Sequence, residues 1–536
     1  MNKKVLLILI GISFVSLFFS IFQKYPTPPC FNADEAAFGY NAYSLLNTGR
    51  DEYGTLLPLR LKSFGDYKMP LYSYLSIPFI AIFGLNEGGT RALNISLSFL
   101  FPFVVYLLSV ELFKGKKVGL VAALLSSVSL GFHIVSRHAH ETYLAAFLTT
   151  LACYLLIKSL QKPSLMRFFF FLITSLLLLF SYHPGRLYVL FFFGFIFLYM
   201  LLQKQKNTLL LVLLFVVIGF FGITDLVYKP ERLKNLIFLN NAGFSLKIDE
   251  LKTEGGIRYL YNPLFIGIKE IILDHLTYFS PQFLVVNGDE NARFGYPGMS
   301  IMTPLEYLFV FIGLYYLFKN KEKWRWFLLL LLFISPLSSS LAWSKGSLTR
   351  TVFLLVPLYI SSSYGFVTFL SQAKNKYRLL VIFCIAVLFL FFQTLDWDFY
   401  LFHYPKRKTV IHAWQCGYKE LGTYIKENYS KYDHFYITKD VGMPYIFMLF
   451  YLQIQPKEYQ KQASLTPADE YGFGQVEKFD KFIFEFKWPR DVEKNSVIVG
   501  SIDDFKNMPS ELKIEPDKLK SVQVFSETMF QIYEGT

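Results

Sequence analysis

A series of long apolar segments constrains this chain more strongly than any other feature of its sequence. Hydrophobic residues make up 53% of the 536 residues and aromatic residues 19%, which is too apolar for a soluble enzyme. Eleven runs are long and apolar enough to cross a bilayer, at residues 5–22, 92–113, 118–136, 143–160, 168–182, 187–202, 208–226, 302–318, 326–340, 350–371 and 378–395. The sequence therefore predicts a polytopic α-helical membrane protein with about eleven transmembrane helices.

The distribution of lysine and arginine predicts which side of the membrane each loop faces. A twelfth apolar run, residues 70–84, has only fifteen residues and two prolines. If this run does not cross, seventeen cations of the N-terminus and short loops fall on one side and only four on the other. Because cytoplasmic loops carry the excess of Lys and Arg, we predict that 70–84 lies in the outer interface. The N-terminus is then inside, the C-terminus is outside, and 5–22 is an uncleaved first span.

The last part of the chain has a different composition. After residue 395, an amphipathic pattern at 417–430 predicts a helix, and four short segments predict strands, at 432–438, 481–486, 495–500 and 521–526. We therefore expect a transmembrane domain over residues 1–395 and a small extracytoplasmic α/β domain over residues 396–536. The net charge of +13 indicates no nucleic-acid partner, because the cations lie mostly in short loops between apolar runs.

The predicted outer face collects polar residues that orientation in the membrane does not require. The first outer loop, residues 23–91, has the acids Asp34 and Glu35 near its start and Lys68 near its end. This arrangement indicates chemistry at the surface, whereas a channel or transporter places its ionisable groups within the spans. A charged first helical turn after an Asn32 cap explains the acid pair equally well.

The other outer loops add a second set of candidates. They are Arg137, His138, His140 and Glu141 in the second loop, His183 and Arg186 in the third, Asp289 and Glu290 in the long loop 227–301, and Arg350 in the fifth. Interface anchoring is an alternative role for Arg137, and helix-dipole compensation is one for Glu141. The spacing of His138, His140 and Glu141 does not place all three on one helical face, so it does not indicate a zinc site. The sequence requires no cofactor and leaves room for a divalent cation.

The four cysteines form no disulfide framework or metal-binding pattern. Cys153 and Cys384 lie in apolar spans, where a packing role is expected. Cys30 and Cys416 both fall on the predicted outer side. The sequence allows a bridge between them but does not favour one, because it shows no proximity.

Several loop motifs together resemble a known superfamily. They are N-A-D-E at 32–35, Y-K-M-P-L-Y at 67–72, S-R-H-A-H-E-T at 136–142, Y-H-P-G-R at 182–186, F-S-P-Q-F-L-V-V-N-G-D at 279–289 and the loop leading to Thr349 and Arg350. In this combination the chain resembles the GT-C membrane glycosyltransferases, in particular the protein O-mannosyltransferase-like and aminoarabinose-transferase-like families (glycosyltransferase families 39 and 83). The sequence departs from these relatives at Met69, where they often have the first proline of Lys-Pro-Pro.

The resemblance implies roles for individual residues. Asp34 and its neighbour Glu35 form the catalytic acid pair, and Glu141 is the acid of the second loop. Lys68 binds the lipid phosphate, and Asp34 takes the proton of the acceptor. The remaining residues expected at the substrate and its phosphate are Tyr72, Arg137, His183, Arg186, Asp289 and Arg350.

The expected function follows from these roles. The protein transfers a sugar from a polyprenyl-phosphate-linked donor to a protein, lipid or glycan acceptor at the outer face of the cell membrane, by one inverting displacement. The phosphate leaving group is already acidic, so the reaction needs cations and one base but no general acid. Two alternatives stay open. One is a non-catalytic polytopic protein of lipid-linked sugar translocation or polysaccharide assembly, and the other is an oligosaccharyltransferase.

Overall fold

The computed structural model comprises two compact units, each built from separate stretches of the chain. It describes residues 2–25, 27–64, 66–203, 208–228, 242–342, 345–465, 476–484, 495–509, 514 and 516–535. Unit 1 consists of Met1–Phe22, Asn94–Arg137 and Glu141–Tyr400, and unit 2 consists of Gln23–Leu93, His138–His140 and Leu401–Thr536. The first outer loop is therefore part of unit 2. The predicted division of the chain at residue 395 remains a prediction.

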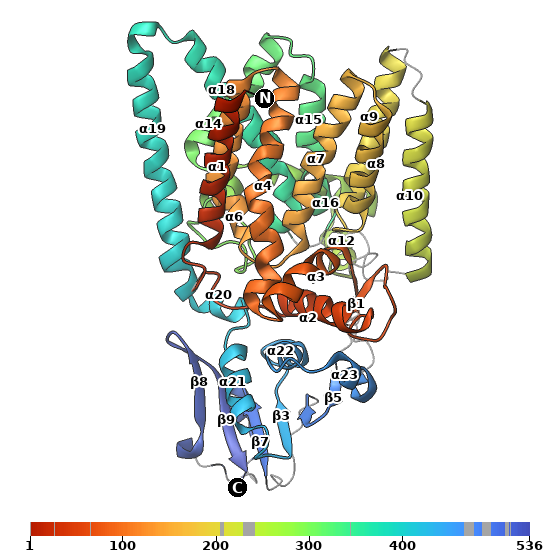
Figure 1. Cartoon of the computed structure of the whole chain (residues 1–536), viewed down its shortest axis with the longest axis vertical. Coiled ribbons are helices and arrows are strands. Elements are labelled where there is room, and N and C mark those ends of the chain that lie inside the picture. Colours follow the sequence, from red (N-terminus) through yellow and green to blue (C-terminus); the bar gives the residue numbers. More distant parts are fainter. Residues whose placement is uncertain are drawn as a thin grey trace. The chain divides into compact units, whose positions relative to one another are not determined.

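Unit 1 is helical throughout its described residues (Figure 1). Its longer helices are α1 (Lys3–Ile21), α5 (Lys116–Val128), α6 (Leu130–Ser136), α7 (Glu141–Gln161), α8 (Leu165–Leu179), α9 (Gly185–Gln203), α10 (Thr208–Tyr228), α12 (Ala242–Glu254), α13 (Pro263–Thr277), α14 (Pro304–Lys319), α15 (Arg325–Ile334), α18 (Leu355–Gln372) and α19 (Asn375–Asp398). Shorter elements are η2 (Arg258–Leu260), η3 (Gln282–Asn287), α16 (Leu337–Ser340), α17 (Leu348–Thr351) and η4 (Val352–Leu354). Helix α4 (Glu87–Phe113) begins in unit 2 and continues into unit 1.

The helices confirm the prediction of a multi-span protein. Among the described residues, six helices are long and apolar enough to cross a membrane, or seven if the bent pair α5–α6 is one span. Each of the eleven predicted apolar runs coincides with a described helix or helix pair. Residues 204–207 and 229–241, the latter in the predicted long loop 227–301, lie outside the described residues.

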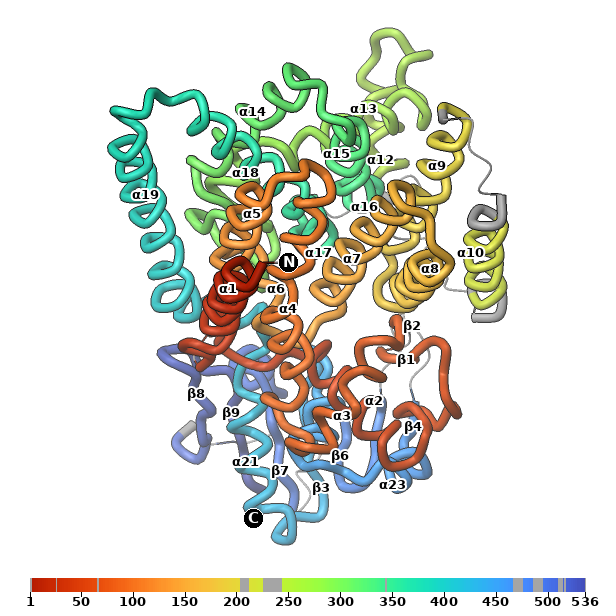
Figure 2. The backbone as a smooth tube through the Cα atoms, turned by 45° about the horizontal axis from the view of Figure 1, so that its top comes forward, coloured from red at the N-terminus to blue at the C-terminus, as the bar shows by residue number. Residues whose placement is uncertain are grey.

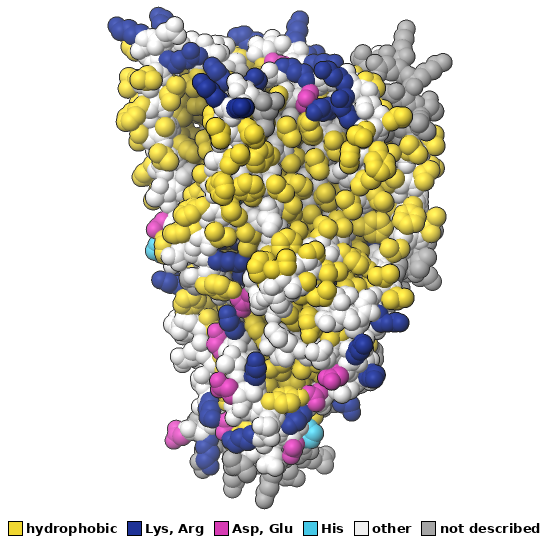
Figure 3. All heavy atoms as spheres, in the orientation of Figure 1, with side chains coloured by type: hydrophobic (Ala, Val, Ile, Leu, Met, Phe, Trp, Pro, Cys, Tyr) yellow, Lys and Arg dark blue, Asp and Glu magenta, His cyan; other side chains and the backbone are white. Residues whose placement is uncertain are grey.

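The surface of unit 1 has the pattern of a membrane-embedded bundle. Hydrophobic side chains cover its helices, and Lys and Arg side chains gather at one end, in the upper part of Figure 3. Exposed lysines at helix ends include Lys114, Lys162, Lys319 and Lys376. Within the bundle, α14 and α18 approach closely at Gly313, where a Cβ atom would lie 1.9 Å from the Ser361 carbonyl oxygen. The backbone groups inside a helix hydrogen-bond to one another. Apolar side chains can therefore face lipid without leaving polar backbone groups unpaired.

Unit 2 combines the first outer loop with the C-terminal part of the chain. The loop contributes α2 (Ala33–Thr48), the hairpin β1 (Leu61–Ser63) and β2 (Asp66–Lys68), and α3 (Leu71–Phe83). The C-terminal part contributes η5 (Phe399–His403, which begins in unit 1), η6 (Tyr404–Lys406), α20 (Lys408–Ala413), α21 (Tyr418–Asn428), β3 (His434–Ile437), α22 (Pro444–Tyr451), α23 (Pro456–Gln462), β4 (Ser464–Leu465), β5 (Val476–Phe479), β6 (Phe482–Ile483), β7 (Ser496–Gly500), α24 (Ile502–Lys506), η7 (Pro516–Lys518), β8 (Lys520–Val524) and β9 (Glu527–Gly535). Figure 2 follows both parts along the chain.

The C-terminal strands form one mixed sheet. Its order is β4-β5-β6-β3-β7-β9-β8, and β3 is parallel to β6 and β7 while the other pairs are antiparallel. All five residues of β7 are buried, as expected for a strand covered on both faces. The helix predicted at 417–430 is α21, and the four predicted strands contain β3, β6, β7 and most of β8.

A disulfide and several packing contacts hold the first outer loop to the C-terminal part within unit 2. Cys30 and Cys416 form a disulfide, with their Cα atoms 5.3 Å apart, although the sequence did not favour this bridge. The rings of Phe31 and Phe450 lie 4.7 Å apart between centroids. Gly39 of α2 lets α22 approach, because a Cβ atom there would lie 2.8 Å from the Phe450 ring. The start of α2 is therefore anchored covalently and by packing.

Candidate functional site

The acid pair lies in the first turn of α2, where the chain enters the helix. The Asn32 side chain accepts a hydrogen bond from the Glu35 backbone N–H (3.0 Å), and the Glu35 carboxylate accepts one from the Asn32 N–H (3.3 Å). This reciprocal capping box pairs two backbone donors that a helix start leaves unpaired. The helix ends at Gly49, whose φ of 67° is left-handed, as the sequence predicts.

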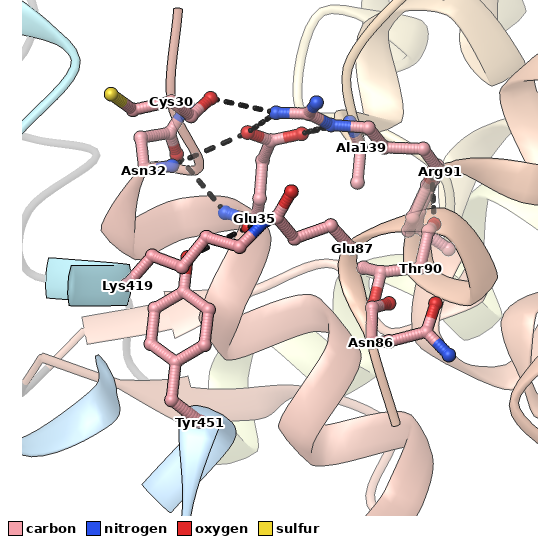
Figure 4. Close-up of polar contacts among 11 residues, drawn as sticks. Cys30, Asn32, Glu35, Asn86, Glu87, Thr90, Arg91, Ala139, Lys419 and Tyr451 are labelled. Carbon is pink, nitrogen blue, oxygen red and sulfur yellow. Dashed lines mark hydrogen bonds and ion pairs between the residues drawn. The ribbon is translucent and has the colours of Figure 1, made fainter. Parts of the chain in front are cut away.

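Glu35 is the centre of a buried polar network (Figure 4). Arg91 Nε donates to Glu35 Oε1 and Arg91 Nη2 to Glu35 Oε2, each over 2.7 Å. Both side chains have no exposed surface. The Ala139 N–H also donates to Glu35 Oε1 (2.7 Å), and Arg91 Nη2 reaches the Cys30 carbonyl oxygen (2.8 Å). Glu35 therefore joins the start of α2 to α4 and to residues 138–140, and both its oxygens are occupied.

Asp34 has a different environment from its neighbour. Its carboxylate is 35% exposed and lies 2.6 Å from Lys68 Nζ, whose side chain is 14% exposed. The structure therefore separates the acid pair into one buried, fully hydrogen-bonded carboxylate and one carboxylate that is accessible to solvent. The sequence placed both acids in a catalytic pair with Asp34 as the base, and in the structure the Asp34 side chain is the exposed one of the two.

Aromatic side chains hold Lys68 in place. Its Nζ lies 4.5 Å from the centroid of the Phe64 ring and 5.2 Å from that of Phe38. Lys68 is the last residue of β2 and pairs with Leu61 of β1. An ammonium against aromatic faces, with little access to water, interacts strongly with an anion. The hairpin therefore presents a fixed cation beside Asp34.

Tyr72 packs against one of the aromatic rings that flank Lys68. It is buried, and its hydroxyl donates to the Thr90 carbonyl oxygen over 3.1 Å. Its ring lies 5.1 Å from that of Phe38, which in turn flanks Lys68. The structure thus gives Tyr72 a packing contact with the wall of the site.

A second buried acid, Glu52, lies near Lys68. Its carboxylate accepts hydrogen bonds from Asn41 Nδ2 and from the Tyr445 hydroxyl, each over 3.1 Å. Burial, with a smaller contribution from Asp51, raises the pKa of Glu52 to about 8, although Lys68 opposes this shift. Glu52 is therefore protonated at neutral pH. The sequence does not single it out, because acids after the helix-ending Gly49 look like ordinary turn residues.

Unit 1 has a separate cluster around Asp289. Asp289 Oδ2 accepts a hydrogen bond from the Leu348 N–H (2.6 Å), and Oδ1 accepts one from the Asn291 N–H (2.7 Å). The carboxylate therefore caps the first turn of α17, which carries Arg350. Burial raises the pKa of Asp289 to about 7, while its backbone donors and the Arg350 guanidinium act in the opposite direction.

Tyr182 connects this cluster to the second-loop acid. Burial raises the pKa of its hydroxyl, the Arg350 charge lowers it, and the carboxylates of Glu141 and Asp289 add to the increase. These four residues therefore lie close enough to interact electrostatically. Within unit 1, the structure brings together three of the predicted site residues: Glu141, Asp289 and Arg350.

The remaining predicted cations differ in accessibility. Arg137 has no exposed surface, donates to the Phe19 carbonyl oxygen and lies 5.8 Å from the Tyr400 ring, so it anchors helices. Arg186 and His183 are half-buried in one turn, where the Arg186 N–H donates to the His183 carbonyl oxygen (3.2 Å). The Arg186 guanidinium lies 4.8 Å from the Phe221 ring. Arg186 is therefore the more accessible cation.

The histidines of the second loop lie in unit 2. The rings of His138 and His140 are 5.6 Å apart, and His138 lies at the same distance from the Trp414 ring. In the part of the chain that the structure describes, no group of three His, Cys, Asp or Glu side chains could hold a metal ion.

The chain is similar to known proteins in sequence and in fold. A family model for dolichyl-phosphate-mannose-protein mannosyltransferase matches residues 11–237. No curated protein sequence matches the chain. The apo oligosaccharyltransferase of Archaeoglobus fulgidus is similar with a TM-score of 0.52 at 14% identity, covering 84% of this chain and 64% of that one. Apo ArnT from Cupriavidus metallidurans is similar with a TM-score of 0.53 at 10% identity, covering 98% and 97%. This chain shares the fold of these two enzymes.

The resemblance of the loop motifs to the GT-C superfamily is thereby confirmed. The chain is a multi-pass membrane protein, and it spans 64% of the length of the archaeal enzyme. A further structure of that enzyme, similar with a TM-score of 0.53 at 14% identity, holds an inhibitory peptide and a dolichol-phosphate. Another, with a TM-score of 0.53 at 13% identity, holds zinc and sulfate.

Sequence reasoning does not find Arg91, the partner of Glu35. Arg91 directly precedes an apolar run, where a cation reads as a membrane-orienting charge. Its partner Glu35 lies 56 residues earlier. The N-x-x-E spacing of the capping box does predict that Glu35 faces back toward the helix start, but no local pattern predicts the arginine.

Proposed function

We propose that this protein transfers a sugar from a polyprenyl-phosphate-linked donor to an acceptor, with Asp34 as the base. The observation that carries the proposal is the ion pair between the half-exposed Asp34 and the aromatic-flanked Lys68. The GT-C fold supports it, as does the dolichol-phosphate in the archaeal neighbour. Glu35, fully engaged by Arg91, is proposed as a structural partner of the base.

Donor binding would change the state of the base. Without donor, Lys68 Nζ is paired with the Asp34 carboxylate at 2.6 Å. The donor phosphate is a stronger partner for an ammonium than a half-exposed carboxylate, because it offers more charge and more acceptor oxygens. When the phosphate binds Lys68, Asp34 loses this ion pair and accepts the proton of the acceptor.

The transfer is a single displacement. Asp34 takes the proton from the acceptor hydroxyl or amine as that atom bonds to the anomeric carbon. The bond between the anomeric carbon and the phosphate oxygen breaks, and its electron pair leaves with the polyprenyl phosphate. Lys68 neutralises the departing phosphate. The configuration at the anomeric carbon inverts, and the products are a glycoside and the free lipid phosphate.

The candidate residues of unit 1 keep the roles that the sequence suggests. Glu141 is proposed to position the acceptor, and Arg186 and Arg350 to provide further positive charge for the phosphate. His183 shares the turn with Arg186. Asp289 acts indirectly, because it caps the turn that carries Arg350.

The orientation of the protein is part of the proposal. Eleven spans would place the cation-rich end of unit 1 in the cytoplasm, since cytoplasmic loops carry the excess of Lys and Arg. The first outer loop and the C-terminal α/β sheet would then both lie outside the cell membrane. The lysines at one end of the bundle (Figure 3) support this orientation.

Two substitutions test the proposal in purified protein. Asp34→Asn should lower turnover roughly 10²- to 10⁴-fold and leave donor binding intact, because Lys68 remains. Lys68→Ala should weaken donor binding by roughly 10- to 100-fold, since a desolvated phosphate loses a charge-assisted partner. Lys62→Ala is the matched control, because Lys62 lies on the same hairpin and 5.0 Å from the Tyr53 ring but outside the ion pair.

The assays are lipid-donor binding and transfer of labelled sugar, measured on the same preparations. Wild-type turnover by Asp34→Asn would show that this acid is only a helix-start charge. Use of a lipid diphosphate oligosaccharide in place of the monophosphate sugar would instead identify an oligosaccharyltransferase. Equal losses from Lys62→Ala and Lys68→Ala would remove the phosphate-binding role.

A further inference from the structure

Two adjoining cavities in unit 2 lie outside the Asp34–Lys68 pair. Their volumes are about 240 and 300 Å³. Four residues line both: Tyr25, Glu87, Lys419 and Tyr451. We call the two together the Glu87 crevice. Its combined size falls within the range of sites for small organic ligands.

Glu87 is the polar centre of this crevice (Figure 4). It is 7% exposed. Its Oε1 accepts a hydrogen bond from the Tyr451 hydroxyl (3.0 Å) and lies 3.3 Å from Lys419 Nζ. Burial and the nearby Glu87 carboxylate raise the pKa of the Tyr25 hydroxyl. Donors and acceptors therefore surround one carboxylate that the transfer mechanism does not use.

Aromatic rings form the walls of the crevice. Tyr25 is 55% exposed and Phe525 is 44% exposed, although both are large and apolar. Lys419 lies 5.1 Å from the centroid of the Tyr25 ring. The face of an aromatic ring carries negative charge, so it packs well against the weakly positive C–H groups on the face of a sugar ring. Exposed rings beside a polar centre are thus suited to a ligand with one apolar and one polar side.

The polar lining is rich in side-chain amides and poor in cations. Asn86, Gln415, Gln453 and Gln523 line one or the other cavity. An amide both donates and accepts hydrogen bonds, as a sugar hydroxyl does. The charged residues of the lining are two carboxylates, Glu87 and Glu420, and one ammonium, Lys419. This balance disfavours a phosphate or an anionic lipid headgroup.

We propose that the Glu87 crevice binds a saccharide without phosphate, on the acceptor side of the transfer. The acceptor class rests on the function proposed above, whereas saccharide binding itself does not. Phe31 forms part of the wall and precedes Asp34 by three residues, so the crevice is built onto the start of the helix that carries the base. The acceptor of the reaction is then a glycan or a glycosylated molecule.

A peptide ligand fits the crevice less well. Extended peptides bind by pairing with a free strand edge, and β8 is the edge strand of the sheet next to the crevice. Only the last two residues of β8, Gln523 and Val524, reach the lining. Two residues offer too few backbone hydrogen bonds for strand pairing to supply the affinity.

Saturation-transfer NMR on the full-length protein in lipid nanodiscs tests saccharide binding directly. The probes are maltotetraose, an N-acetylglucosamine tetramer and a Ser/Thr-rich decapeptide. Tyr25→Ala and Phe525→Ala should each weaken saccharide binding on the order of 2- to 10-fold. Gln523→Ala, a change at an exposed position, should weaken it without affecting folding. Tyr377→Ala is the matched control, since Tyr377 is 52% exposed with Lys376 5.7 Å from its ring.

The outcomes separate the two proposals. Binding of a saccharide that Tyr25→Ala weakens and Tyr377→Ala does not supports the crevice, and an increased KM for a glycan acceptor in the same variant supports its role. Absence of saccharide binding, equal effects of both variants, or binding of the peptide alone would overturn the inference. Donor binding to Lys68 is measured separately. If the protein binds the donor but no saccharide binds in the crevice, only the proposed acceptor class is disproved. Saccharide binding without donor binding disproves only the transfer reaction.

Discussion

Replacing Glu35 by glutamine should destabilise the protein rather than only stop catalysis. The substitution keeps the size of the side chain and removes its charge. Arg91, which has no exposed surface, then remains buried without its counter-ion. Removing one partner of a buried ion pair costs about 3–5 kcal/mol, because the other charge cannot return to water.

The geometry places the cost toward the upper end of that range. The Glu35 carboxylate accepts four hydrogen bonds, from Asn32 N, Arg91 Nε, Arg91 Nη2 and Ala139 N. Glutamine has only one acceptor oxygen, so its NH₂ group must face a donor. By contrast, the Asp34 carboxylate is 35% exposed, and Asp34→Asn should cost only about 0–1 kcal/mol.

Thermal unfolding of the purified variants, measured beside transfer activity, separates the two acids. Glu35→Gln should melt at clearly lower temperature than wild type, whereas Asp34→Asn should melt near wild type and lose turnover. The double variant Glu35→Gln with Arg91→Gln should be more stable than the sum of the single changes, because neither member of the buried pair then keeps a charge without its partner. If Glu35→Gln melted like wild type and lost transfer, Glu35 would be a reacting group and the structural role assigned to it would be wrong.

Three further predictions concern topology, covalent structure and pH. In a background without the two free cysteines, Gly115→Cys should resist a membrane-impermeant thiol reagent added to intact cells while Lys345→Cys reacts, and labelling at 115 would reverse the proposed orientation. Replacing Cys30 and Cys416 by serine should destabilise unit 2 by about 2–5 kcal/mol, seen as faster proteolysis, and unchanged proteolysis would remove the bridge as an anchor. Burial raises the pKa of Glu52 from 4.5 to about 8, so the folded protein holds a proton there that the unfolded chain releases, and the stability that Glu52 contributes falls as pH rises from about 4.5 to 8. The melting temperature of Glu52→Gln should therefore rise relative to that of wild type between pH 5 and pH 9. A constant difference between the two melting temperatures over this range would contradict the raised pKa.

The sequence by itself determined the features that depend on neighbouring residues. Apolar runs must become helices in a membrane, because only a helix pairs every backbone group within one segment. The cap at Asn32, the helix end at Gly49 and the C-terminal strands follow from equally local patterns. The loop motifs, taken in combination, were enough to indicate the GT-C superfamily.

The tertiary structure decided what the adjacent acids do. In sequence, Asp34 and Glu35 are equivalent charges in one helical turn. Glu35 accepts hydrogen bonds from Arg91 and from the Ala139 N–H, which lie 56 and 104 residues away, whereas Asp34 pairs with Lys68. The Cys30–Cys416 bridge spans 386 residues. Such contacts depend on how distant segments pack, and the free energy that selects them is spread over the whole interface, so no local pattern in the sequence reports them.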